Sequence, residues 1–335
     1  MTETDKAKEL QKVVEKMRQG LDSFEERYDF EPEQHLRLEG LPLERRMFDG
    51  FVLGAAISNE VYRSALAYEP DEDDVFICTY PKCGTTWAQM ILFQLMNEGR
   101  TPDQTPNKTI FFASPMLEFF GSELSKAVAP RPRLVKSHLP YERLPQSRGC
   151  KNKTVLVTRN PKDTLVSFYY HQRLFKSYEF KSTSITDAYV DVFLDGKDFE
   201  FGSYFDYING WMPHLHEEHV LHLKYEDMLK DHKGAVVQMA NFLGGSAKAL
   251  VQDADKLQAI VDMSSFDHMK KEARKEMPDA FIAPGAKHEF IRKGKKGSWR
   301  ENLTKEQSRK IDVKFHECFK GTEFEPYWPE EMRTD

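Results

Sequence analysis

A strand, a tight turn and a helix follow one another in the first third of the chain, and this order restricts the fold. Residues 75–79, VFICT, form an apolar run of strand length, and Thr85 to Asn97 have the apolar content and length of a helix. Between them, Lys82 and Gly84 lie in the stretch TYPKCGTTW. Such a turn directs the free backbone N–H groups of a helix N-terminus toward one point, which suits an anion.

Strands and helices continue to alternate along the chain. Further strands are expected at 133–136, 154–158 and 220–225, and further helices at 162–175 and 228–243. This alternation predicts an α/β fold with a central parallel sheet that helices cover on both faces. Ligands of such sheets bind beyond the carboxyl ends of the strands.

Length and composition are compatible with one large domain. The chain has 335 residues, of which 40% are hydrophobic, so it can bury a large core. We expect a single domain over 41–335, preceded by an extension over 1–40 with an amphipathic helix at 9–26. The net charge of −6 disfavours nucleic-acid and membrane partners. Four scattered cysteines, with no apolar run of membrane-spanning length, predict a reduced, cytoplasmic protein.

Two further segments combine cations with hydroxyl groups or glycines. RNPKDTLVS, residues 159–167, follows an expected strand and places an arginine and a serine at the beginning of a helix. FIRKGKKGSWR, residues 290–300, combines five cations with two glycines that let a backbone approach an anion closely. Each segment alone has an ordinary structural interpretation, such as helix capping, a snorkelling arginine or a solvated basic loop. Three of them in one chain favour an anionic ligand.

The order of these motifs resembles that of the soluble sulfotransferases, which transfer a sulfuryl group from 3′-phosphoadenosine 5′-phosphosulfate (PAPS) to a small acceptor. TYPKCGTTW is similar to the 5′-phosphosulfate loop of that family, RNPKDTLVS to its 3′-phosphate segment and RKGKKGSW to its C-terminal loop. RLVKSHLP, residues 133–140, is similar to the segment with the catalytic histidine, and YEDM and SSFDHMKK fall in family order. The resemblance covers roughly residues 51 to 328 and implies the P-loop-kinase-like sulfotransferase fold.

The resemblance assigns each part of PAPS to a group of residues. The 5′-phosphosulfate group is assigned to the loop residues Lys82, Cys83, Gly84, Thr85 and Thr86. The 3′ phosphate, which distinguishes this donor from ATP, is assigned to Arg159, Ser167, Arg292, Lys293 and Gly294. The adenosine is assigned to Trp87, Tyr225, Ser264 and Phe266, with Phe266 opposite Trp87. PAPS is therefore the expected co-substrate and PAP the product, with no metal required.

The resemblance also implies the catalytic residues. His138 matches the general base, and a histidine pKa of about 6.5 suits removal of a proton from an acceptor hydroxyl near neutral pH. Lys136 and Lys82 would neutralise charge on the transferring group and the leaving phosphate. The implied reaction is an in-line displacement. Taken without its flanking motif, His138 is more often a strand-end histidine bonded to backbone.

The acceptor pocket is expected to be apolar and aromatic. Six apolar residues precede the histidine segment and could form this wall: Phe111, Phe112, Met116, Leu117, Phe119 and Phe120. For most of them, the alternative is an ordinary position in the protein core. Met116 and Phe119 match substrate-facing family positions, and Tyr169, Tyr170 and Phe281 could contribute from elsewhere. A phenol, a steroid or a similar small molecule would suit such a wall.

Two positions and one segment depart from the family pattern. Cys83 stands where the family commonly has serine, and a thiol beside Lys82 could have a lowered pKa. Ser298 replaces a common aspartate in the C-terminal loop. Residues 300–309 lack the apolar residue and the acid of the usual dimer motif, so a monomer or a different dimer is expected.

Two other functions share parts of this pattern. A nucleoside or nucleotide kinase would have the same strand, loop and helix, but it should show a Gly-Lys-Ser/Thr loop and a Mg-binding acid after a strand. Neither is evident in the sequence. A non-catalytic nucleotide-binding protein would keep the loops without needing His138 beside Lys136.

Overall fold

The computed structural model describes most of the chain after the first 34 residues. The described residues are 35–38, 41–54, 57–129, 131–175, 178, 180, 182–276, 282–286 and 290–332. The helix expected at 9–26 and the acceptor residue expected at Phe281 lie outside these residues.

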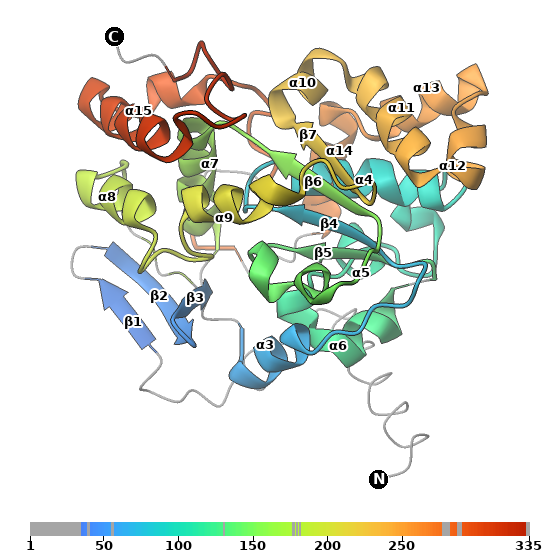
Figure 1. Ribbon diagram of the computed structural model, residues 1–335, viewed down its shortest axis with the longest axis horizontal. Coiled ribbons are helices and arrows are strands. Elements are labelled where there is room, and N and C mark those ends of the chain that lie inside the picture. Colours follow the sequence, from blue (N-terminus) through green and yellow to red (C-terminus); the bar gives the residue numbers. More distant parts are fainter. Residues whose placement is uncertain are drawn as a thin grey trace.

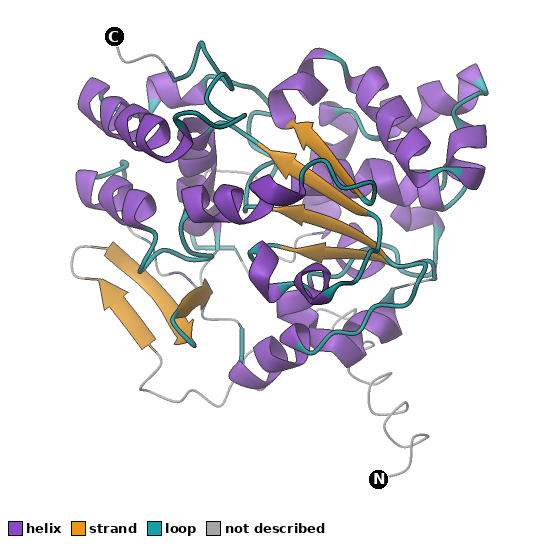
Figure 2. Cartoon of the chain, viewed as in Figure 1, coloured by secondary structure: helices purple, strands orange, loops and turns teal. Residues whose placement is uncertain are grey.

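A sheet of four parallel strands forms the centre of the molecule (Figures 1 and 2). In spatial order the strands are β5 (Leu134–Ser137), β4 (Val75–Thr79), β6 (Thr154–Thr158) and β7 (Val220–Lys224). All three neighbouring pairs run in the same direction. The prediction of an α/β fold with a central parallel sheet is confirmed.

Most of the other regular elements in the described part of the chain are helices. They are α3 (Asn59–Leu66), α4 (Thr85–Met96), α5 (Ile110–Ala113), α6 (Leu117–Val128), α7 (Pro161–Leu174), α8 (Asp187–Asp195), α9 (Tyr204–Trp211), α10 (Tyr225–Lys230), α11 (His232–Leu243), α12 (Gly245–Leu250), α13 (Ala254–Met263), α14 (Phe266–Glu276) and α15 (Lys305–Phe319). Figure 1 shows α4 and α11–α13 to one side of the central sheet, and α7, α8 and α15 to the other.

Both faces of the sheet are buried, which explains why its strands have continuous apolar sequences. Alternate side chains of β4 belong to different cores. Val75 and Ile77 pack with residues of α4, α11 and α13, whereas Phe76 and Cys78 pack with residues of α7, α9 and α15. Each face of β4 therefore packs against a separate apolar core.

The buried side chain of Ile77 in β4 should contribute strongly to the stability of the fold. Ile77 is completely buried in β4, so Ile77→Ala removes apolar contacts and leaves a cavity. We expect the free energy of unfolding to fall by about 2–5 kcal/mol in urea denaturation. Val313 on α15 is 45% exposed, and Val313→Ala should change this free energy by less than about 0.5 kcal/mol. Equal effects of the two substitutions would contradict the buried position of Ile77.

Two features differ from the sequence-based expectations. The helix expected at 228–243 is two helices, α10 and α11, because the Asp231 side chain accepts a hydrogen bond from Gly234 N and starts a new helix. Strand β1 (His35–Leu38) pairs with β2 (Leu41–Phe48), which pairs with β3 (Phe51–Gly54). This antiparallel sheet lies beside the central sheet and extends across the expected boundary at residue 40 (Figure 1).

Within the described ranges, no helix is both long and apolar enough to cross a membrane.

Candidate active site

The carboxyl ends of three central strands bring the predicted loops to one edge of the sheet. The register pairs Cys78 with Ser137 and Thr79 with Val157, so β4, β5 and β6 end at the same level. A hydrogen bond crosses between two of the loops, with 2.8 Å between His138 Nδ1 and the carbonyl oxygen of Thr79. The segments after β4, β5 and β6 are therefore neighbours, as the sequence predicts.

The loop between β4 and α4 has the backbone geometry of an anion site. Lys82 has a φ of 71° and Gly84 a φ of 96°, so the chain turns sharply before the helix begins. A side chain at Gly84 would place its Cβ 2.7 Å from the ring of Tyr225. Gly84 offers no side-chain cap, and the first helical bond runs from Ala88 N to Gly84 O. The N–H groups of the first turn of α4 thus have no acceptor within the helix and can bind an anion.

The Lys82 ammonium lies over this turn. Its Nζ is 3.2 Å from His171 Nδ1 and 4.6 Å from the centre of the Phe290 ring. Burial lowers the pKa of Lys82 to about 7, with contributions from the charges of Lys136, Arg159 and Arg292. Cations concentrated in this way attract an anion strongly.

The two threonines of this loop differ in their surroundings. Thr85 is buried, and its hydroxyl lies 2.6 Å from that of Thr79. Thr86 is half-buried on the first turn of α4. Thr85 therefore bonds within the protein, while Thr86 lies nearer the surface of the turn.

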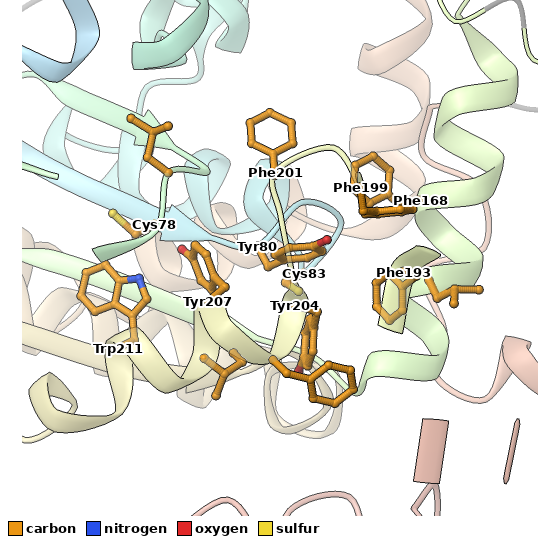
Figure 3. Close-up of a cluster of buried hydrophobic side chains, with 14 of the residues drawn as sticks. Cys78, Tyr80, Cys83, Phe168, Phe193, Phe199, Phe201, Tyr204, Tyr207 and Trp211 are labelled. Carbon is orange, nitrogen blue, oxygen red and sulfur yellow. The ribbon is translucent and has the colours of Figure 1, made fainter. Parts of the chain in front are cut away.

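The Cys83 side chain lies in the protein core. Its side chain is completely buried, with Sγ 3.6 Å from Thr164 Oγ1, and it belongs to the core cluster that also contains Tyr80 and Tyr204 (Figure 3). Burial raises the pKa of the Cys83 thiol to about 12. The prediction of a lowered thiol pKa was wrong, because desolvation outweighs the nearby positive charge.

His138 has one ring nitrogen bonded and the other available as a base. A carbonyl oxygen only accepts, so Nδ1 donates its proton to Thr79 O, and Nε2 carries the lone pair. Burial lowers the pKa of His138 well below its usual range, with a further contribution from Lys136. The imidazole is therefore neutral near pH 7, the form that can accept a proton.

Glu118 fixes the backbone of the histidine segment. Its Oε1 accepts a hydrogen bond of 2.6 Å from His138 N, and its Oε2 accepts one of 3.0 Å from Ser137 Oγ. Burial raises the pKa of Glu118 to about 7 and lowers that of Lys136 to about 8. The sequence analysis missed Glu118, because nothing in its local pattern indicates that a glutamate on α6 is buried against β5.

Arg159 joins the phosphate loop to the C-terminal loop. Its Nη1 donates to Lys82 O at 3.0 Å and its Nη2 to Lys295 O at 3.2 Å, while the guanidinium stacks on Tyr225 at 4.4 Å. Its buried Nε has no hydrogen-bond partner in the part of the chain that the structure describes. Arg159 therefore presents an unused donor in a cationic environment.

The C-terminal loop is attached to α7 through Asp163. The Asp163 carboxylate accepts hydrogen bonds from Gly297 N at 2.6 Å and Trp299 N at 3.0 Å, and from Ser298 Oγ at 3.2 Å. Ser298 Oγ also accepts a bond of 3.1 Å from Arg292 Nη2. The serine at this position thus connects the loop to both Asp163 and Arg292. Asp163 is part of the motif RNPKDTLVS, but the sequence does not indicate that its carboxylate holds the C-terminal loop.

The remaining residues expected at the 3′ phosphate lie on the same two segments. Ser167 is half-buried on α7, and Lys293 forms an ion pair with Glu301. Gly294 has a φ of 57°, and a Cβ there would lie 2.2 Å from the Phe266 ring. Only glycine allows the loop to pass this close to α14.

Of the residues expected around the adenosine, Trp87, Tyr225 and Ser264 come together. Trp87 lies edge-on to Tyr225, with ring centres 5.7 Å apart, and its Nε1 donates to His232 Nε2 at 3.3 Å. The Ser264 hydroxyl lies 2.9 Å from the same His232 nitrogen. Phe266 is 37% exposed. The sequence analysis missed His232, the first residue of α11, which joins Trp87 to Ser264.

The residues expected in the acceptor wall fall into two groups. Met116 and Phe119 are half-buried, and Met116 forms an isolated bridge with Lys136. Tyr169 is 1% exposed, packs edge-on against Phe180 and Tyr189, and donates its hydroxyl to Ser182 O. Tyr169 therefore belongs to the core in this structure and offers no wall to an acceptor. Of the other aromatic residues, Phe111 is exposed, Tyr170 is half-buried, and Phe112 and Phe120 are buried.

Comparison with known proteins identifies the family. The family model described as "Sulfotransferase domain" matches residues 72–323. Among curated proteins, amine sulfotransferase from Oryctolagus cuniculus is 34% identical over 267 residues, which are 78% of this chain and 85% of that protein. Sulfotransferase 2B1 from Mus musculus is 30% identical over 297 residues, or 88% and 83% of the two chains.

Solved structures agree in fold. The crystal structure of mouse sulfotransferase SULT7A1 complexed with PAP matches with a TM-score of 0.65 and 25% identity, covering 83% of this chain and 96% of that one. Retinol dehydratase, solved with androsterone and inactive cofactor PAP, has a TM-score of 0.70 at 22% identity and covers 88% and 96% of the two chains. With a matching family model and relatives of this similarity, the chain belongs to the sulfotransferase family.

Proposed function

We propose that this enzyme transfers a sulfuryl group from PAPS to the hydroxyl or amine of a small apolar acceptor, with His138 as the general base. The observation that carries the proposal is the geometry of His138, whose Nδ1 is bonded to Thr79 O so that Nε2 carries the lone pair, beside Lys136 and next to the uncapped N-terminus of α4. Lys82 in that turn, with Arg159 and Arg292 nearby, supplies the positive charge that a donor with two phosphate groups requires.

The proposed donor position follows from these sites. The N-terminus of α4, with Lys82 above it, would hold the 5′ phosphosulfate. Arg159 Nε, Arg292 and Ser167 would hold the 3′ phosphate, and Trp87 with Phe266 would enclose the adenine. PAP, the expected product, is the ligand of the mouse sulfotransferase structure.

The proposed chemical step needs no residue beyond those described. The acceptor oxygen attacks sulfur while its proton passes to Nε2 of His138, and the bond between sulfur and the bridging oxygen of the 5′ phosphate breaks. Lys82 stabilises the charge that develops on that leaving oxygen, and Lys136 the charge on the transferring group. Among the residues with described positions, no group of three or more His, Cys, Asp or Glu side chains is arranged to hold a metal ion.

The proposed acceptor is a phenol, a steroid or an amine. Met116 and Phe119 are half-buried apolar side chains on the histidine side of the site, and Met116 pairs with Lys136. One curated relative at 34% identity is an amine sulfotransferase, which supports including amines. A cytoplasmic location, and a monomer or a dimer without the usual family motif, are predictions that accompany this proposal.

Donor binding should take up a proton above pH 7. In the protein without a donor, the pKa of Lys82 is about 7. The negative charge of a bound phosphosulfate or phosphate stabilises the ammonium, so this pKa is higher in the complex. Between these two pKa values the affinity for PAP should fall by up to about tenfold per pH unit. Calorimetry at pH 8.5, in two buffers with different ionisation enthalpies, measures the uptake.

Lys136, whose pKa of about 8 lies in the same range, could also contribute to the pH dependence of PAP binding. A matched variant separates the contribution of Lys82. Arginine stays charged throughout, so Lys82→Arg should remove the part of the pH dependence that Lys82 contributes. A Kd for PAP that is constant from pH 7 to pH 9 in the wild-type protein would contradict the prediction.

The proposed function is tested by sulfuryl transfer from labelled PAPS to a panel of phenols, steroids, amines and aliphatic alcohols. Product formation supports it. Phosphoryl transfer from ATP, without transfer from PAPS, would instead identify a kinase. Tight PAP binding without turnover on any acceptor would favour a nucleotide-binding protein.

A further inference from the structure

A second imidazole, that of His171, lies beside the Lys82 ammonium. His171 is on α7, one helical turn after Ser167, and its Nδ1 is 3.2 Å from Lys82 Nζ. Its ring is half-buried and packs edge-on against Phe175 at 4.8 Å and Phe290 at 5.9 Å. Neither the sequence motifs nor the proposed mechanism gives this histidine a role.

The direction of the hydrogen bond follows from chemistry. An ammonium only donates, so Nδ1 of His171 accepts, and its proton resides on Nε2. This is the opposite tautomer to that of His138, whose Nδ1 donates. Burial and the charge of Lys82 lower the pKa of His171 well below its usual range, which keeps the imidazole neutral and able to accept.

We propose that His171 is a positioning residue that holds the Lys82 ammonium over the 5′-phosphosulfate site by accepting its hydrogen bond. The proposal rests on the proposed function, because it assigns the held charge to the leaving oxygen. It would explain how a flexible lysine keeps one position among other cations, since Lys136, Arg159 and Arg292 all disfavour its charge there.

Lys82 is restrained at both ends. Its backbone oxygen accepts a hydrogen bond of 3.0 Å from Arg159, and its Nζ lies between His171 and the face of Phe290. The Phe290 ring contributes a cation–π attraction but no hydrogen-bond acceptor. Among the described residues, His171 is therefore the acceptor that fixes the direction of the ammonium. This matters because a charge placed before the reaction stabilises the transition state most.

Two substitutions separate the acceptor atom from the shape of the ring. His171→Phe keeps a ring against Phe175 and Phe290 but deletes the acceptor. His171→Asn keeps an acceptor, because its Oδ1 can occupy the position of Nδ1. We expect kcat to fall by about tenfold or more in His171→Phe, as for loss of a hydrogen bond to a charged group, and by less than about threefold in His171→Asn. At pH 6, where Lys82 is mostly charged in every variant, the Kd for PAP, which lacks the sulfuryl group, should change by less than about threefold in both.

A second readout needs no turnover. Competitive acetylation, quantified by mass spectrometry, gives the midpoint at which Lys82 loses its proton. Removing the acceptor destabilises the ammonium, so this midpoint should fall by about half a unit or more in His171→Phe and stay near the wild-type value in His171→Asn. The other titratable groups near the pair are the same in every variant: Lys136, His138, Arg159, Arg292, Cys83 and Tyr178.

The outcomes distinguish the two proposals. Equal losses of kcat in His171→Phe and His171→Asn, or an unchanged Lys82 midpoint in His171→Phe, would overturn the positioning role. If His171→Phe does not fold, His171→Met serves as the variant without the acceptor. If the wild-type protein transfers no sulfuryl group to any acceptor, the proposed function fails, while the Lys82 midpoint still tests whether His171 holds the ammonium.

Discussion

Replacing His138 by asparagine should lower kcat for sulfuryl transfer by about 10²- to 10⁴-fold, the contribution of a positioned general base. Asparagine can keep the hydrogen bond to Thr79 O through its side-chain NH₂, so the loop between β5 and the following segment should stay in place. It has no atom at the position of Nε2 and cannot accept the acceptor proton. Initial rates with labelled PAPS and an accepted phenol measure the effect.

The control is donor affinity. His138 makes its bonds to Thr79 and Glu118 and is not assigned to either phosphate, so the Kd for PAP should change by less than about threefold in His138→Asn. His216, on the surface with an 84% exposed side chain, provides a matched histidine, and His216→Asn should have wild-type kcat. Wild-type turnover in His138→Asn would remove the assigned base.

Removing the Arg292 side chain should raise the Kd for PAP by about 30-fold or more. Its guanidinium is held by Ser298 Oγ and stacks on Tyr170 at 4.3 Å, so it is already in position to bind a phosphate. Losing one partner of a partly buried, hydrogen-bonded charge pair typically costs 2–5 kcal/mol. The effect should be confined to ligands with a 3′ phosphate, so the Kd for adenosine 5′-phosphate should be nearly unchanged in Arg292→Ala. Calorimetry with the two nucleotides provides the comparison.

Lys296 offers a matched control in the same loop. Its side chain is 51% exposed and pairs with Glu330 on the surface, so Lys296→Ala should affect both nucleotides by less than about threefold. A similar loss of affinity for PAP and adenosine 5′-phosphate in Arg292→Ala would mean that Arg292 supports the loop and does not read the 3′ phosphate.

The local features of the chain were predictable from the sequence. The sequence correctly predicted two strands, at 75–79 and 154–158, because buried parallel strands are short apolar runs. It also predicted the helix beginning at Thr85, because Gly84 marks the turn that precedes that helix. The helix over 228–243 failed at Asp231, where one side chain caps a new helix within an apolar pattern that continues.

The partners of the site residues were not predictable in this way. Glu118, His171 and His232 lie far in sequence from the groups they bond, namely His138, Lys82 and Trp87. No local pattern marks these residues, because their hydrogen bonds exist only when separate elements pack together. Cys83 shows the same limit in reverse, since its neighbours in sequence suggested a reactive thiol while the fold encloses it in a core.

The sequence by itself determined the family, the parallel α/β sheet and the order of three cation-containing segments, because each depends on residue types at short, regular spacing. Only the tertiary structure decided the protonation of His138, the low pKa of Lys82 and the burial of Cys83. These properties depend on desolvation and on charges from β5, α7 and the C-terminal loop, which come together only when the sheet edge is assembled.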